Sequence, residues 1–378
     1  MSVYLDNAAS TPIDPKVWEE MVPYFLNHYA NPSSIHSHGR EARSAIEKSR
    51  KKVAELLNTS PSEIFFTSGG TEADNMAIRS SIHSFNLKHA ITSKVEHHAV
   101  LHTLETLEKN GAIELSFVDL DKKGTVSLDH LRQLIASNPN SLVSLMHANN
   151  EIGNLNDIDD IGNLCKENSC LLHSDTVQAM GHYVHDLSTN LQDFIVGAAH
   201  KFHGPKGSGF LYINRRNKMN PLIIGGAQER NMRGGTENVA GIVGLAKALE
   251  IAYDTMDDDR KYIESLKTKM IDSLKEKISG VSFNGESESM DKSLYTLLNV
   301  SVPESDDNDM LLFSLDIKKV SVSGGSACTS GTNIGSHVLE AIGSNPKKGA
   351  VRFSFSKFTT KEEVDYAVNS LSEIINRN

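Results

Sequence analysis

The chain has 378 residues, of which 39% are hydrophobic, and a formal net charge of −10. This length exceeds what one compact core holds and predicts two domains. No run approaches the roughly 18 apolar residues of a transmembrane helix, and the acidic charge argues against a nucleic-acid partner. The N-terminus lacks the basic and apolar regions of a signal peptide. Three cysteines without a C-x-x-C pair favour neither a disulfide framework nor zinc, so we expect a cytoplasmic protein without a metal or a membrane partner.

The first strong unit in chain order is a strand, a glycine turn and a helix. A helix after Pro15 and a second over 39–57, which Ser34 or Ser37 could cap, precede it. Residues 63–66 predict a buried strand, 67–71 (TSGGT) a tight turn and 72–82 a helix. Free N–H groups and the helix dipole make such a helix start an anion site. The spacing fits neither an ATP loop nor a dinucleotide fingerprint, so the turn predicts a phosphate site or an ordinary strand–helix connection.

Strands and helices then alternate, which predicts a mostly parallel sheet covered on both faces. The expected strands are 89–92, 113–118, 142–146, 170–172, 194–196 and 207–213, and the expected helices between them are 94–110, 128–136 and 158–168. Residues 225–238 are polar, glycine-rich and too long for a simple connector, as functional loops often are.

A helix over 239–253 ends the first domain, and a long helix starts at the acids 257–259, which suit a helix N-terminus. We place the boundary near Thr255. The large domain then spans 14–255, and residues 1–13 with 256–378 form a smaller α+β domain. Its expected strands lie near 281–283, 294–300, 320–322 and 351–355.

The stretch from residue 173 to 209 gathers the chemistry. One apolar strand leads to Asp175 and Gln178, and the next leads to His200 and Lys201. The carboxyl ends of parallel strands form the ligand-binding edge of such a sheet. An acid that pairs with a ring nitrogen, together with a lysine that forms a Schiff base, is typical of pyridoxal phosphate (PLP) sites. The alternative is a surface acid and a surface lysine at loop ends.

Two other residues are candidates for the same site. His97 falls in the first turn of a predicted helix, where the macrodipole favours a neutral imidazole fit for ring stacking or proton transfer. The chain has 16 histidines, so His97 is a candidate only together with Asp175 and Lys201, and we expect His98 to be a surface bystander. Arg352 could hold a substrate carboxylate through two hydrogen bonds, or it could be an ordinary strand-edge arginine.

Cys328 lies in a run of glycine and serine, which predicts an exposed thiol that reaches a substrate as a nucleophile. Cys165 and Cys170 lie in apolar surroundings and are expected to be buried structural residues.

These motifs resemble the cysteine desulfurases, PLP enzymes of the class V aminotransferase-like superfamily with fold type I. The matching segments cover nearly the whole chain and are YLDNAASTP, NPSSIHSHG, FTSGGTEADN, EHHAV, NNEIG, HSDTVQA, AHKFHGPKG, GGAQE, RGGTEN, SGGSACTSG and VRFSFSKFTT. The segment around Cys328 is similar to that of the long-cysteine-loop group. The resemblance implies a seven-stranded-type sheet in the large domain and places Cys328 in the small one.

The resemblance also implies roles around the cofactor. Lys201 would bind PLP covalently, Asp175 would pair with its ring nitrogen, Gln178 would contact its phenolic oxygen and His97 would stack on the ring. The expected phosphate ligands are Gly70, Thr71 and His200, with Thr236 reaching in from the partner subunit of a homodimer. Members usually carry a serine three residues before the lysine, and here that position is Ala198, which predicts weaker retention of PLP.

For the substrate, the resemblance implies that Asn150 and Arg352 bind the carboxylate of L-cysteine. Cys328 would take the sulfur as a persulfide, leaving L-alanine, and pass it to an acceptor such as an iron–sulfur scaffold or a tRNA-thiolating protein. Two alternatives stay open at this point. One is a selenocysteine lyase or other class V enzyme, and the other is a non-catalytic sulfur carrier with the same fold.

Overall fold

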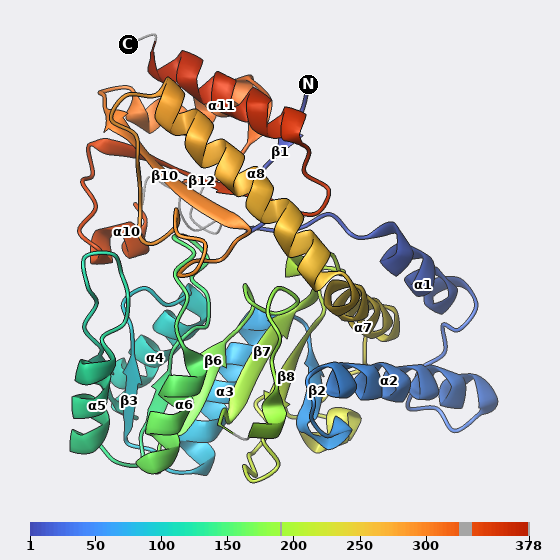
Figure 1. Ribbon diagram of the computed structural model, residues 1–378. Coiled ribbons are helices and arrows are strands. Elements are labelled where there is room, and N and C mark those ends of the chain that lie inside the picture. The colour runs from blue at the N-terminus through green and yellow to red at the C-terminus, as the bar shows by residue number, and fades with distance from the viewer. Residues whose placement is uncertain (190, 325–334, 377–378) are drawn as a thin grey trace.

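The computed structural model describes residues 1–189, 191–324 and 335–376. Its larger unit is built on a seven-stranded sheet with the order β2-β8-β7-β6-β5-β3-β4 (Figure 1). The strands are β2 (Ile64–Thr67), β3 (His89–Thr92), β4 (Glu114–Phe117), β5 (Leu142–Ser144), β6 (Leu171–Asp175), β7 (Phe194–Ala198) and β8 (Gly209–Ile213). The five strands β7, β6, β5, β3 and β4 each run parallel to the next one in this order. Strand β8 runs antiparallel to both of its neighbours, β2 and β7. The predicted mostly parallel sheet is confirmed.

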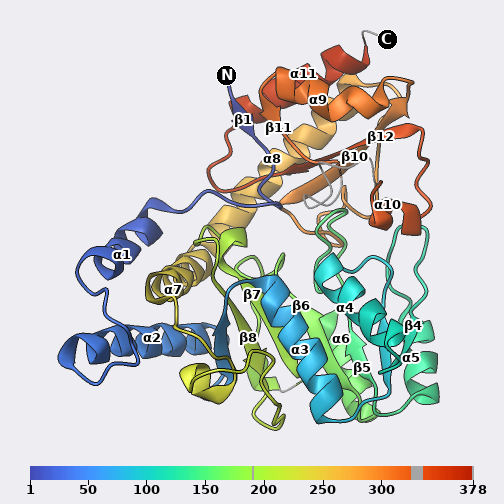
Figure 2. The same ribbon diagram turned by 180° about the vertical axis from the view of Figure 1, so that it is seen from behind.

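Helices cover both faces of this sheet, as Figures 1 and 2 show from opposite sides. The helices of this unit are α1 (Pro15–Leu26), α2 (Ser37–Leu56), α3 (Gly70–Ser84), α4 (His98–Lys109), α5 (Leu128–Ser137), α6 (Ile158–Glu167) and α7 (Val239–Asp254). Successive residues of β7 pack in different layers: Phe194 and Val196 join the cluster of α3 and α4, whereas Ile195 joins that of α1, α2 and α7. Burial of both faces explains why the strands read as continuous apolar runs.

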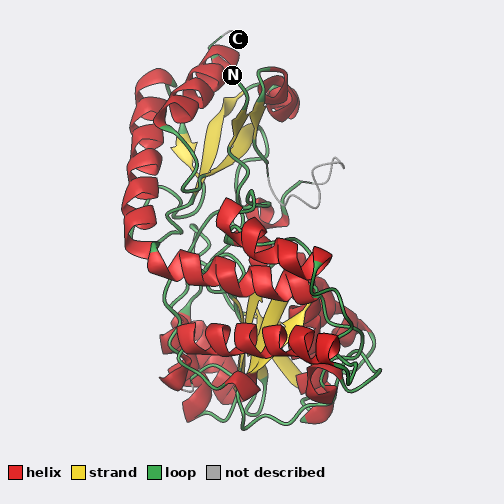
Figure 3. Ribbon diagram, turned by 90° about the vertical axis from the view of Figure 1, so that its right-hand side faces the viewer, coloured by secondary structure: helices red, strands yellow, loops and turns green. Residues whose placement is uncertain are grey.

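The smaller unit is an antiparallel sheet backed by helices (Figure 3). β10 (Leu297–Glu304) lies between β9 (Ser282–Phe283) and β12 (Lys348–Ser354). The N-terminus belongs with this unit, because β1 (Val3–Tyr4) pairs with β11 (Val320–Ser321). Its helices are α8 (Met256–Lys277), α9 (Leu311–Ile317), α10 (His337–Ala341) and α11 (Lys361–Ile375). The proposed boundary at Thr255 falls between α7 and α8.

Two local details differ from expectation. The cap of α2 is neither Ser34 nor Ser37 but His36, whose Nδ1 accepts a hydrogen bond from the Gly39 amide at 3.2 Å. An imidazole nitrogen does the work of the usual hydroxyl there, which the cap preferences do not anticipate. The strand expected over 142–146 ends at Ser144.

Across the described part of the chain, the helices are all too short or too polar to cross a membrane.

Candidate active site

The carboxyl edge of the large sheet opens into a cavity of about 200 Å³. The residues that line it come from the ends of β6 and β7, from the start of α3, from the segment before α4 and from β12. Nine of the predicted site residues line this cavity: Gly70, Thr71, His97, Asn150, Asp175, Gln178, His200, Lys201 and Arg352. The exposed Thr236 does not line it, and Cys328 lies outside the described residues. Distant segments of sequence therefore converge on one site.

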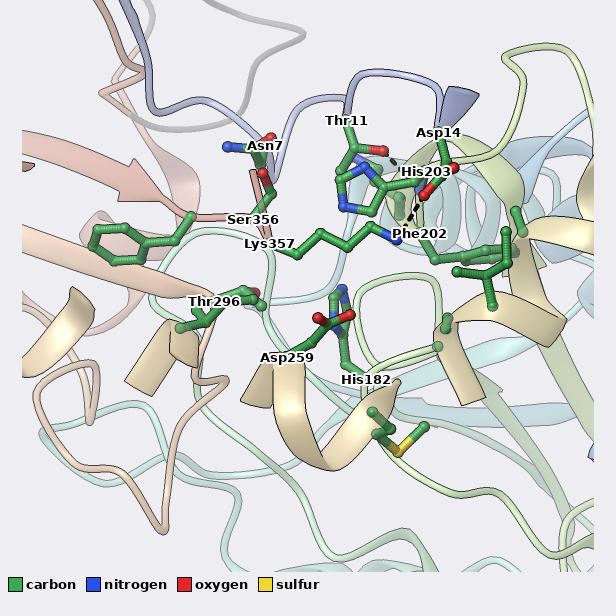
Figure 4. Close-up of a pocket in the computed structure, with 18 of the residues that line it drawn as sticks. Asn7, Thr11, Asp14, His182, Phe202, His203, Asp259, Thr296, Ser356 and Lys357 are labelled. Carbon is green, nitrogen blue, oxygen red and sulfur yellow. Dashed lines mark hydrogen bonds and ion pairs between the residues drawn. The ribbon is translucent and has the colours of Figure 1, made fainter. Parts of the chain in front are cut away.

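A smaller cavity, which Lys201 also lines, lies between the two units (Figure 4). It is closed by an ion pair of 2.7 Å between Lys357 Nζ and the Asp14 carboxylate. Its volume of about 30 Å³ suits a water molecule or two. It is too small for a ring-sized cofactor, so the larger cavity is the candidate site.

Lys201 is held by the N-terminal segment of the other unit. Its ammonium donates hydrogen bonds to the carbonyl oxygens of Ala8 and Ala9. Gln178 Nε2 donates to the same Ala8 oxygen at 3.0 Å. These hydrogen bonds hold the amine of Lys201 at the wall of the cavity that Asp175 also lines.

The start of α3 forms the anion end of the cavity. Gly69 provides no side-chain cap, so the first-turn N–H groups are available to a ligand. A Cβ on Gly70 would lie 2.8 Å from Val177 Cγ2, so any larger residue here would force Val177 to move. The acid in this turn, Glu72, is paired with Arg233 of the 225–238 loop at 2.8 Å. Burial alone would raise the pKa of Glu72, but hydrogen bonds from Arg233 and Ser68 lower it.

Asp175 and His97 face each other at one end of the cavity, which we call the base end. Asp175 Oδ1 accepts a hydrogen bond from the Val177 amide at 2.9 Å. His97 caps α4, and its Nδ1 accepts from the Ala99 amide at 3.1 Å. Burial is the main cause of its lowered pKa, with the Asp175 carboxylate acting in the opposite direction. The lowered pKa favours a neutral ring, and because Nδ1 accepts the cap bond, the proton of that ring lies on Nε2. The sequence analysis expected a neutral ring from the macrodipole, whereas burial is the main cause here.

Three buried residues at this end were missed by the sequence analysis: Asp74, Glu96 and His173. Asp74 Oδ1 lies 3.3 Å from His173 Nε2, and its carboxylate lies within 4.8 Å of the nearest ligand atoms of His97 and Asp175. Burial raises the pKa of Glu96 to about 8. A usable signal was present for two of them, because Asp74 lies four residues after Gly70 on one helix face and His173 lies two before Asp175 on one strand face.

Arg352 marks the opposite end of the cavity and is 1% exposed. Its Nη1 donates to the Asn150 carbonyl at 2.7 Å and its Nη2 to Asp6 Oδ1 at 2.9 Å. Its Nε and the side-chain oxygen of Asn150 are buried without a partner among the described residues. Arg352 lies on the edge strand β12 but is buried, and a buried guanidinium with an unmet donor is suited to an anionic ligand. Asp6, the acid beside it, was also missed.

The remaining histidine and cysteine predictions have mixed outcomes. His98 is not a surface bystander, because its half-buried ring packs between His102 and His337 at centroid distances of 4.4 and 4.3 Å. Cys165 and Cys170 are buried as expected.

The model of the aminotransferase class-V family matches residues 3–367 of the chain. The chain belongs to this family. It is 42% identical over 379 residues to the cysteine desulfurase IscS of Dictyoglomus turgidum, covering 99% of this chain and 95% of that one. Membership of this family implies dependence on PLP.

Solved structures agree with this assignment. A NifS-like protein has a TM-score of 0.91 and 37% identity, and each chain is fully covered by the other. The structure of SspA in complex with cysteine has a TM-score of 0.82 and 32% identity, covering 95% of this chain and all of that one. The chain thus shares its whole fold, and not one domain alone, with a NifS-like protein.

Proposed function

We propose that this class-V family member is a cysteine desulfurase that releases sulfur from L-cysteine as a persulfide and leaves L-alanine. The observation that carries the proposal is the full-length similarity to a cysteine desulfurase, in a chain whose cavity holds Lys201, Asp175 and Arg352. The cavity has a cationic amine, a carboxylate and a helix start, which complement the aldehyde, ring nitrogen and phosphate of PLP. When bound, the cofactor supplies an electron sink for bond breaking at the substrate.

The residues of the chain divide the remaining work. In this proposal Lys201 carries the cofactor covalently, Asp175 holds the ring nitrogen in its charged form, and Gln178 contacts the phenolic oxygen. His97 would stack on the ring, and its Nδ1 cap bond would leave the proton of the neutral imidazole on Nε2. Gly70, Thr71 and His200 hold the phosphate, with Thr236 of a second subunit.

The substrate end follows from the buried arginine. The unmet Nε donor of Arg352 would receive the carboxylate of L-cysteine, and the Asn150 amide would orient it. The Cys328 thiolate then attacks the substrate sulfur. The carbon–sulfur bond breaks, its electron pair stays with the substrate carbon, and protonation of that carbon gives alanine. A protein such as an iron–sulfur scaffold or a tRNA-thiolating enzyme would accept the sulfur from Cys328.

A second copy of the chain is the proposed partner. Large apolar side chains gather on α1 and the loop after it, and each is more than half exposed: Trp18, Phe25, Leu26, Tyr29 and Ile35. Exposed apolar surface of this kind is typical of protein–protein interfaces. The exposed position of Thr236 is compatible with a role in the partner subunit. The cytoplasmic location stays a prediction.

The test is sulfide release and alanine formation from L-cysteine by the PLP-loaded protein with a thiol reductant. Cys328→Ser is compared with Cys170→Ser, which removes a buried thiol that does not line the cavity. We expect activity in the parent and in Cys170→Ser, and none in Cys328→Ser. Activity in Cys328→Ser would support a lyase, including a selenocysteine lyase, that expels the chalcogen without a protein thiol. The absence of bound PLP in the parent would favour a non-catalytic carrier.

A further inference from the structure

Asp74 and His173 form a buried pair next to Asp175, and Asp74 also lines the cavity. His173 Nε2 lies 3.3 Å from Asp74 Oδ1, and the two side chains are 0% and 1% exposed. Neither atom makes a hydrogen bond of good geometry with any described residue, including the other member of the pair. Unpaired buried polar atoms are costly, so these two atoms satisfy each other or remain unsatisfied.

The pair is directly connected to the base end of the cavity. His173 and Asp175 are two residues apart on β6 and therefore point to the same face of the sheet. The carboxylate oxygens of Asp74 and Asp175 lie within 4.8 Å. Two buried carboxylates at this distance do not both ionise without a compensating charge. A proton held or shared by one of them would remove this repulsion.

The hydrogen bonds indicate which one. His173 Nδ1 lies 2.8 Å from the Ser144 hydroxyl on β5, which leaves Nε2 for Asp74. Burial lowers the pKa of His173 to about 3. Burial raises the pKa of Asp74, and the nearby Asp175 and Glu96 raise it further. The lowered pKa of His173 and the raised pKa of Asp74 both favour an uncharged pair.

Other charged or titratable groups at this end are Asp175 itself, Glu96 and His97 before α4, and Lys201 after β7. Asp175, His97 and Lys201 line the cavity, as Asp74 does, whereas Glu96 does not. A neutral Asp74 would leave the full carboxylate charge on Asp175, where a protonated ring nitrogen needs it.

We propose that Asp74 and His173 share one proton and act as positioning residues, forming a neutral support that leaves Asp175 to carry the negative charge facing the ring nitrogen of PLP. This inference rests on the proposed function, because it assumes that the cavity binds PLP. It predicts that the two residues are coupled, so that losing both costs less than losing His173 alone.

The test titrates the full-length apoprotein with PLP and measures the dissociation constant by visible absorbance. His173→Phe leaves Asp74 without its partner beside Asp175, and we expect PLP binding to weaken by about 10-fold or more. His173→Phe with Asp74→Leu replaces both polar groups by apolar ones, and we expect the constant to return to within about threefold of the parent. Both variants lose the Ser144 contact equally, so that loss does not affect the comparison.

A second variant keeps the inference falsifiable if His173→Phe does not fold. Asp74→Asn keeps the size and the neutrality of the protonated acid, and we expect PLP to bind within about threefold of the parent. A 10-fold loss in Asp74→Asn, or no recovery in the double variant, would overturn the pairing. The melting temperatures of the apoproteins report packing separately. A parent that bound no PLP would overturn the proposed function, and this inference with it.

Discussion

The two anion sites of the cavity are built in opposite ways. The start of α3 offers backbone N–H groups, and its nearby acid, Glu72, is already paired with Arg233. The other site is the side chain of Arg352, whose charge is shared with Asp6 at 2.9 Å. Among the described residues, the acid at the first site is held by an arginine, whereas a ligand at the second site shares the guanidinium of Arg352 with Asp6. The first design suits a cofactor that stays, and the second suits a substrate that comes and goes.

The largest effect is expected from Arg352→Met, which removes the substrate site and leaves Asp6 without its ion pair. We expect kcat/KM for L-cysteine to fall by roughly 100-fold or more, because truncating one partner of a buried charge pair costs about 2–5 kcal/mol. The PLP content of the purified protein should not change. A parallel loss of PLP would show that the two sites are not independent.

The phosphate site is tested by Gly70→Ala. Its Cβ would lie 2.8 Å from Val177 Cγ2, and we expect PLP affinity to fall by about 10-fold as a result of overpacking. Adding Val177→Ala removes the colliding methyl group and should recover most of the affinity. With PLP saturating, KM for L-cysteine should stay the same in both variants. Unchanged PLP affinity in Gly70→Ala would contradict the close approach.

Restoring the missing hydroxyl at the phosphate end is expected to have a smaller, opposite effect. Ala198 is buried and lines the cavity. Ala198→Ser should slow the loss of PLP on dialysis by roughly 10-fold, since a hydrogen bond to a charged group contributes about 1–3 kcal/mol. Equal rates of loss in the two proteins would show that another donor already serves the phosphate.

The smallest effect is expected from Asp6→Asn, which removes the negative charge beside Arg352. The asparagine keeps an oxygen that can accept the hydrogen bond that the Ser323 hydroxyl donates to Asp6 Oδ1 at 2.9 Å. We expect KM for L-cysteine to fall by about threefold to fivefold, the equivalent of about 1 kcal/mol of ion pairing. Steady-state kinetics at fixed PLP measures it. A higher KM would mean that Asp6 orients Arg352 more than it competes with the substrate.

Local sequence patterns were sufficient for the sheet and for the cofactor edge. Strands of a parallel sheet are short and buried on both faces, so their apolar runs stand out, and the residues that follow two of them, Asp175 and Lys201, must meet at one edge. The glycine turn before α3 is equally local, because a strand, two glycines and a helix start lie within about ten residues of sequence. The antiparallel direction of β8 could not be predicted from the sequence, since an apolar run looks the same in a parallel and in an antiparallel strand.

The tertiary structure alone decided how the site groups are paired. Asp6 meets Arg352 across 346 residues, and Ala8 meets Lys201 across 193. Asp74 meets His173 only because α3 packs on β6. No periodicity encodes such contacts, since they depend on how the two units and their layers pack. Sequence therefore determined which chemical groups reach the cavity, whereas packing decided which of them are already paired and which are left for a ligand.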